Sequence, residues 1–180
     1  MASEIEHEGK VLDIDPETIV AAIIKAGGAH VTDRMMRRFV YNTVPVTPTK
    51  WIRLRDDGEQ VTLCVKEIVS DAIDGTRETE VVVSDFDTAN ALLQELGFPP
   101  KAYQENRRSS WLLDGVQMEI DYWPLIPPYL EIEGASPDEV YGALDAIGLP
   151  SSRLTSVNTT EVYRRHGIDL GEITDLRFPE

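Results

Sequence analysis

The chain has 180 residues, and its 32 acidic and 17 basic side chains give it a formal net charge of −15 at pH 7. Nucleic acids and anionic membranes require a basic surface, so this charge argues against either as a partner. The hydrophobic content of 42%, the lack of an apolar run long enough to span a membrane and the single Cys64 predict one globular cytoplasmic domain spanning residues 1–180.

The first predicted element is a strand over residues 4–12 that has one charged face. Side chains alternate between the two faces of a strand, so this face carries Glu4, Glu6, Glu8 and Lys10. Three carboxylates would repel one another on an open sheet, but a divalent cation in a water-filled cavity would neutralise them. A charged edge strand that faces solvent is the alternative interpretation.

The next segments predict a helix, a short strand and a hairpin. The helix begins at Asp15-Pro16 and ends before Gly27. We expect a strand over residues 35–41 that ends at Pro45, followed by a hairpin in which residues 51–55 and 61–66 flank an Asp-Gly turn.

The second half of the chain predicts further strands and short helices. The expected strands are 76–83, 103–113, 116–122 and 129–134. Helices are expected after Asp85, after Ser136 and near residues 160–165. About eight strands with short helices between them indicate an antiparallel sheet that must close on itself or be covered.

Four of these strands carry acids at alternate positions, and basic strands lie between them. The acidic pairs are Glu6/Glu8, Glu78/Glu80, Glu119/Asp121 and Glu131/Glu133. Leu130 and Ile132 occupy the other face of the last of these strands, so its apolar side packs away from its acids. The pattern favours a closed barrel with a polar lumen and helices outside, although a sandwich with one wet, charged face remains the alternative.

A lumen lined by acids and by Arg or Lys suits a polyphosphate bound together with Mg²⁺ or Mn²⁺. Hard divalent cations bind carboxylate oxygens, and guanidinium groups bind phosphate oxygens in pairs. No glycine-rich loop followed by Lys-Ser/Thr is present, which excludes nucleotide binding through a P-loop.

Several motifs in one order resemble the CYTH family, the triphosphate tunnel metalloenzymes. Glu6-His7-Glu8-Gly9-Lys10 resembles the family's E-x-E-x-K signature, and Arg53-Leu54-Arg55 with Lys66 resembles its basic hairpin. The resemblance continues through Glu78-Thr79-Glu80, the strand around Arg107-Arg108, Glu119-Ile120-Asp121 and Tyr129–Gly134. The Arg37–Tyr41 segment fits the family's second strand only loosely, so its roles stay open.

The resemblance implies an α+β fold: a closed eight-stranded antiparallel β tunnel (barrel) with a polar lumen and short helices packed on its outside. The implied metal ligands for Mg²⁺ or Mn²⁺ are Glu6, Glu8, Glu78, Glu80, Glu119, Asp121, Glu131 and Glu133. The implied substrate-binding residues are Lys10, Arg53, Arg55, Lys66, Arg107 and Arg108, and of the last two only Arg108 is expected to enter the lumen. Lys66, Tyr41 and Arg53 are the candidate catalytic residues, with the Lys66 ammonium expected to lower the pKa of the Tyr41 phenol so that it serves as a base.

The activity that the resemblance implies is metal-dependent hydrolysis of inorganic triphosphate or of an organic triphosphate such as thiamine triphosphate. A class IV adenylate cyclase, which makes cyclic AMP and pyrophosphate from ATP, is the first alternative. A polyphosphate-binding module without turnover is the second. The expected partner is thus a small triphosphate, with no nucleic acid and no membrane, and the protein is expected to be a monomer or a homodimer.

Overall fold

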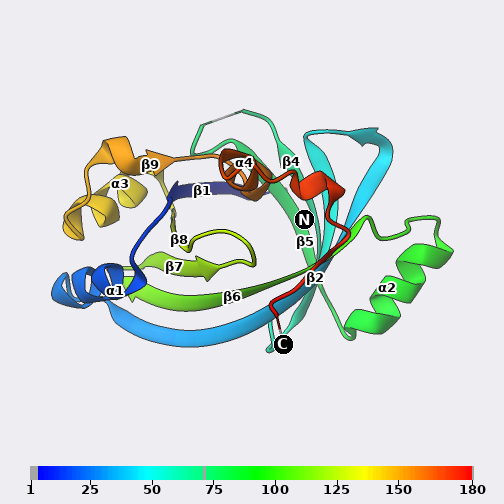
Figure 1. Ribbon diagram of the computed structural model, residues 1–180, viewed down its shortest axis with the longest axis horizontal. Coiled ribbons are helices and arrows are strands. Elements are labelled where there is room, and N and C mark those ends of the chain that lie inside the picture. The colour runs from blue at the N-terminus through cyan, green and yellow to red at the C-terminus, as the bar shows by residue number, and fades with distance from the viewer. Residues whose placement is uncertain (1–3, 71, 180) are drawn as a thin grey trace.

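The computed structural model describes residues 4–70 and 72–179, with side chains from residue 7 onward. Within this part of the chain, ten strands belong to one sheet (Figure 1). Their bounds are β1 Glu4–Val11, β2 Ala29–Thr47, β3 Lys50–Asp56, β4 Val61–Ile68, β5 Thr76–Val83, β6 Ala102–Leu113, β7 Val116–Tyr122, β8 Tyr129–Gly134, β9 Leu154–Thr155 and β10 Asp175–Leu176.

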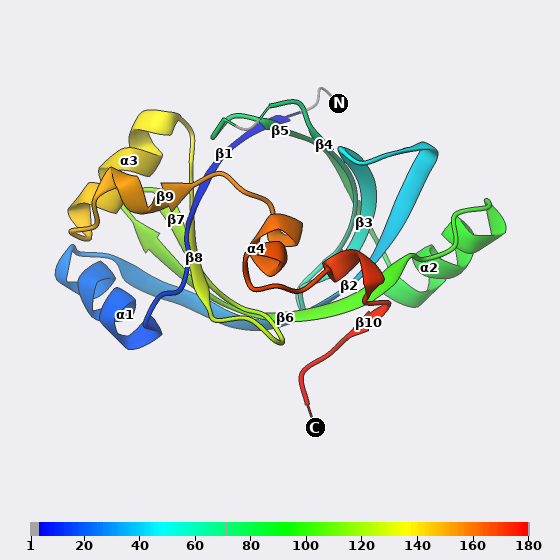
Figure 2. The same cartoon turned by 45° about the horizontal axis from the view of Figure 1, so that its top comes forward.

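The sheet is strongly curled around its polar face (Figure 2). Its main strands are antiparallel neighbours in the order β6-β2-β3-β4-β5-β1-β8-β7, and β7 pairs with β6 as well as with β8. The shortest pairing between two main strands is that of β1 with β5, in which only residues 4–6 of β1 pair with Thr76–Glu78. Beyond that point β1 leaves β5 and pairs with β9 at Lys10 and Val11.

These pairings confirm the expected α+β class and the curled antiparallel sheet with a polar inner face. The expected closed eight-stranded barrel needs correction. The sheet has ten strands among the described residues, and it is a half-barrel that opens where β1 and β5 separate, because their shared ladder is only three residue pairs long. The short β9 and β10 attach at the outside of the curl, on β1 and β6.

The α-helices of the described residues are α1 Pro16–Lys25, α2 Phe86–Glu95, α3 Pro137–Ala146 and α4 Thr159–Arg165, with two short 3₁₀ turns at Ser151–Arg153 and Leu170–Glu172. Three begin where capping chemistry predicted, since the side chains of Asp15, Asp85 and Ser136 accept a hydrogen bond from the backbone three residues on. None of the helices described is both long and apolar enough to cross a bilayer.

The apolar core lies on the outer face of the curled sheet, as the alternation in β8 predicted. Ile120, Leu130 and Ile132 are fully buried there, in a cluster that α1 and α3 cover. A second cluster places Leu54 of β3 beneath Phe86 of α2. Burial of these side chains therefore fixes the inner face as the polar one.

Strand β2 is much longer than the predicted residues 35–41. It runs from Ala29 to Thr47 and passes through Pro45, which follows a cis peptide bond. Pro45 was expected to end the strand because proline has no backbone N–H to donate. The ladder with β3 is interrupted between Asn42 and Thr47, so Pro45 lies where no regular pairing needs that donor.

Candidate functional site

The polar face of the sheet encloses a cavity of about 1540 Å³. Inward-facing side chains of β1–β8 line it, and residues 158–161 and 164 at α4 line one mouth, where Figure 2 shows α4 in front of the opening. Typical small-molecule pockets measure roughly 300–1,000 Å³, so the space exceeds what a bare triphosphate needs.

One wall of the cavity is acidic and comes from three neighbouring strands. It consists of Glu8 on β1, Glu119 and Asp121 on β7, and Glu131 and Glu133 on β8. The register pairs Glu8 with Glu133 and Glu119 with Glu131, which sets the carboxylates side by side. The predicted alternation has therefore brought five of the eight predicted acids together on one surface.

Two cations neutralise part of this acidic wall. Lys10 Nζ lies 2.8 Å from Glu8 Oε1 and 3.0 Å from Glu131 Oε2. Arg108 donates to both oxygens of Asp121 at 2.7 and 2.6 Å and to Glu131 Oε1 at 2.9 Å. Although burial opposes ionisation, Lys10 and Arg108 hold the pKa of Glu131 well below its ordinary value.

Glu119 lies in a different electrostatic environment from Glu131. Its Oε2 accepts a hydrogen bond from Ser110 Oγ at 2.6 Å, while its nearest cation, Arg108, stands 3.9 Å away. Burial raises the pKa of Glu119, and the Arg108 guanidinium and the Ser110 hydroxyl offset this only in part. The acidic wall thus holds both a firmly ionised carboxylate and one that ionises less readily.

The facing wall is basic and comes from β3 and β4. Arg53 is 7% exposed, and one of its amino groups stands 3.4 Å from Glu78 and 3.3 Å from Glu80, while Lys66 pairs with Glu78. The Nε–H groups of Arg53 and Arg55 are buried and have no hydrogen-bond partner among the described residues. Burial and the neighbouring Arg53 and Arg108 charges lower the pKa of Arg55 to about 10.

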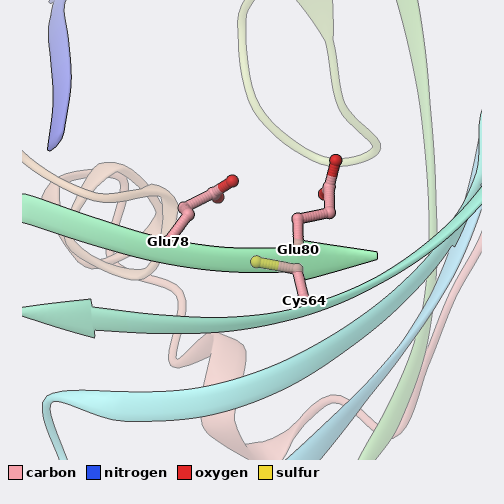
Figure 3. Close-up of side chains that lie close together, drawn as sticks. All are labelled: Cys64, Glu78 and Glu80. Atoms are coloured by element: carbon pink, nitrogen blue, oxygen red, sulfur yellow. The ribbon is translucent and has the colours of Figure 1, made fainter. Parts of the chain in front are cut away.

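A smaller group on β4 and β5 brings together one atom each of Cys64, Glu78 and Glu80 within 4.8 Å of one another (Figure 3). Both carboxylates rise from β5 on the side that the Cys64 thiol also faces. The basic wall already contacts these acids, and Mg²⁺ and Mn²⁺ prefer oxygen to sulfur. The oxygen-only acidic wall therefore fits those ions better than this group does.

Arg38 is a lumen residue to which the sequence pattern assigned no role. It lies on β2 opposite Arg55 and Gln104, and its guanidinium donates to Asn106 Oδ1 and stacks 4.6 Å from the centre of the Trp123 ring. The sequence does contain a signal for this placement. Phe39 and Tyr41 are apolar and lie at odd-numbered positions, so the even-numbered Arg38 falls on the opposite, polar face of the strand.

Tyr41, predicted as a catalytic base beside Lys66, lies on the opposite face of the sheet. Its ring is fully buried beneath α2, and its hydroxyl donates to Asn90 Oδ1 at 3.0 Å. Burial raises the pKa of its phenol, contrary to the expected lowering. The expectation was wrong because Tyr41 is at an odd-numbered position of β2, whose even-numbered positions face the lumen.

Arg107, Glu6 and Gly9 complete the description of the predicted motifs. Arg107 points away from the cavity and stacks 4.4 Å from the Phe178 ring centre, so it cannot contact a ligand there, whereas Arg108 faces inward as expected. The backbone of Glu6 lies in β1, but its side chain is outside the described part of the chain. Gly9 marks a close approach of Leu154, whose side chain would lie 2.8 Å from an added Cβ.

Comparison with known proteins agrees with this geometry. Residues 4–153 match the family model described as the CYTH domain. No curated protein matches the chain.

Several solved structures share the fold at low sequence identity. The PH1012 protein of Pyrococcus horikoshii is 21% identical, with a TM-score of 0.75 over 88% of this chain and 99% of its own. A Vibrio parahaemolyticus protein provisionally assigned as an adenylate cyclase is 13% identical, with a TM-score of 0.74 over 91% and 99%. The Hippeastrum protein HpAC1, described as an adenylyl cyclase candidate with a dominant triphosphatase activity, is 17% identical, with a TM-score of 0.62 over 96% and 100%.

Proposed function

The chain belongs to the CYTH domain family, and from this premise we propose that it is a metal-dependent triphosphatase that binds inorganic or organic triphosphate inside its curled sheet. The whole chain, residues 1–180, would act as a single domain around this one site.

One observation supports the proposal most strongly. The buried Nε–H groups of Arg53 and Arg55 belong to lumen-lining side chains and have no partner among the described residues. A buried donor that lacks an acceptor costs about 1–3 kcal/mol, and phosphate oxygens are the acceptors that guanidinium groups match best. A polyanion in the lumen would satisfy both donors and relieve the mutual repulsion of the two arginines.

The acidic wall would hold the cation that the family's members require. Glu8, Glu119, Asp121, Glu131 and Glu133 offer oxygen ligands from adjacent strands, as Mg²⁺ or Mn²⁺ demands. Such an ion supplies charge neutralisation of the phosphates and acidifies a bound water. Lys10 and Arg108, which now contact these acids, would then be available to the substrate oxygens.

In the proposed hydrolysis, water attacks the terminal phosphorus in line with the bond to the departing diphosphate. Arg53 and Arg55 would bind the phosphate oxygens and stabilise the negative charge that develops on the leaving group. Lys66, which is held by Glu78, would add a third positive charge from β4. No proton transfer is assigned to Tyr41, because its hydroxyl is on the far side of the sheet.

One structural neighbour, HpAC1, supports the choice of hydrolysis over cyclisation. HpAC1 carries a cyclase name but is described by its dominant triphosphatase activity, and the Vibrio protein is provisionally assigned as a cyclase. A cyclase would also need a pocket for adenine, and the sequence pattern identifies none. Cys64 is buried and is the single cysteine of the sequence, which fits the reducing, cytoplasmic location that we propose from the sequence.

Product analysis tests the proposal. Purified protein is incubated with Mg²⁺ or Mn²⁺ and, separately, with inorganic triphosphate, thiamine triphosphate and ATP. Orthophosphate release is the expected result, and the relative rates rank the substrates. Cyclic AMP and pyrophosphate from ATP would replace the proposal with the cyclase. Thermal stabilisation by triphosphate without any product would leave a binding module.

A further inference from the structure

Three features of Arg38 bear on its role. Its Nε–H is buried and has no partner among the described residues, although it stands in a cavity. Its amino group and its planar face are already fixed, by Asn106 and by the Trp123 ring. Its cross-strand neighbour in β3 is a second arginine, Arg55.

The surroundings of Arg38 contain more positive than negative charge. Arg53 and Arg55 are its strongest charged neighbours, and the carboxylate of Asp121 offsets their repulsion only in part. Burial, followed by these two arginines, lowers the pKa of Arg38 to about 9. The side chain is therefore held in a position that opposes its own charge as long as no anion is present.

We propose that Arg38 is a phosphate-binding residue of this site, which completes with Arg53 and Arg55 a three-arginine cluster for the oxygens of a triphosphate. Asn106 and Trp123 hold the guanidinium at the lumen wall, where a small movement of the side chain would bring its unpartnered Nε–H to a ligand oxygen. The inference rests on the proposed function, and it assigns a role to β2 that the sequence pattern left open.

This role predicts effects of opposite sign on stability and on binding. Replacing Arg38 by Gln removes a buried cation from beside two others, so the empty protein should melt at a higher temperature. The same change removes a charge-assisted contact with phosphate, so triphosphate should bind about 10- to 100-fold more weakly. If Arg38 only stabilised the fold through its contacts with Asn106 and Trp123, its removal would lower the melting temperature instead.

Arg37 provides a matched control on the same strand. Its guanidinium also stacks on an aromatic ring, 4.4 Å from the centre of Phe86, but it lies on the outer face and is ion-paired with Asp56 at 3.0 Å. Arg37→Gln therefore removes the same charge and the same kind of stacking without touching the lumen. Its affinity for triphosphate should stay within about twofold of the parent protein.

The experiment measures thermal unfolding and calorimetric binding of inorganic triphosphate in metal-free buffer, and KM for triphosphate with Mg²⁺, for the parent, Arg38→Gln and Arg37→Gln proteins. The expected result is a raised melting temperature without ligand and a 10- to 100-fold loss of affinity in Arg38→Gln alone. Arg38→Lys serves if the Gln variant does not fold. It keeps the charge but loses the two-pronged contact, and should also bind more weakly.

The possible outcomes distinguish a failure of the Arg38 assignment from a failure of the proposed function. A parent protein that binds triphosphate, with Arg38→Gln binding it within twofold, overturns the assignment of Arg38 and leaves the proposed function intact. A lowered melting temperature with unchanged KM would also overturn the assignment, because it would show that Arg38 only stabilises the fold. A parent protein that neither binds nor hydrolyses triphosphate overturns the proposed function, and the assignment of Arg38 with it.

Discussion

Arg108→Met should destabilise the protein because it removes the cation paired with the buried Asp121 and one of the two cations paired with the buried Glu131. Asp121 is 1% exposed and Glu131 is 8% exposed, and Arg108 makes three short hydrogen bonds to them. Breaking a buried ion pair by removing one partner costs about 3–5 kcal/mol. We expect the lower end, about 3 kcal/mol, because the Arg108 side chain is 17% exposed and water can partly replace it.

Urea unfolding followed by tryptophan fluorescence measures this loss, and the slope of the transition shows whether unfolding remains two-state. In a chain of this length, about 3 kcal/mol corresponds to a fall of roughly 6–12 °C in melting temperature. Arg107→Met is the matched control, because Arg107 lies next in sequence but stacks on Phe178 outside the cavity. Its effect should stay within about 0.5 kcal/mol.

The pH dependence of stability checks the same reasoning. The folded pKa of Glu131 is lowered, so its contribution is complete above the ordinary value of 4.5 and is lost as the pH falls below it. In Arg108→Met this acid-induced loss should be smaller, since only the two lysines, Lys10 and Lys66, would still favour the ionised Glu131. The account of the acidic wall would be refuted if Arg108→Met were as stable as the parent at pH 7 and lost the same free energy of unfolding as the pH fell.

Two further substitutions test the placement of Tyr41 and the close packing at Gly9. Tyr41→Phe should cost about 1 kcal/mol in urea unfolding through the lost hydrogen bond to Asn90, with kcat within twofold of the parent, and a large fall in kcat would contradict the outward placement. Gly9→Ala should destabilise the protein by about 1–3 kcal/mol in thermal unfolding, because its Cβ would lie 2.8 Å from Leu154. Leu154→Ala combined with Gly9→Ala should recover part of that loss, whereas additive effects would show that the two residues do not clash.

Most of the sheet was predictable because period-two alternation and turn chemistry are local signals. Strand β5 has the predicted bounds, Thr76–Val83. The turn at Asp114-Gly115 has both residues at positive φ, as a tight hairpin requires. The split between β1 and β5 and the attachment of β9 were not predictable, because they depend on which distant strands meet.

The site was predictable only to the level of which face each residue takes. Alternation placed Glu119, Asp121 and Glu131 on one wall correctly, and it separated Arg108 from Arg107. The role predicted for Tyr41 is wrong because Tyr41 and the lumen-lining Arg38 occupy opposite faces of β2. The ion pairs within the lumen could not be predicted either, because partners such as Lys10 and Glu131 are joined only by the curl of the sheet.

The central claim is that the acidic and basic walls act together on a triphosphate, and orthophosphate release from inorganic triphosphate with Mg²⁺ tests it most directly. Glu131→Ala is compared with the parent and with Glu95→Ala, which removes an exposed carboxylate at the end of α2. The account predicts a loss of about 100-fold or more in kcat for Glu131→Ala and no change for Glu95→Ala. Full activity in a folded Glu131→Ala protein would contradict it.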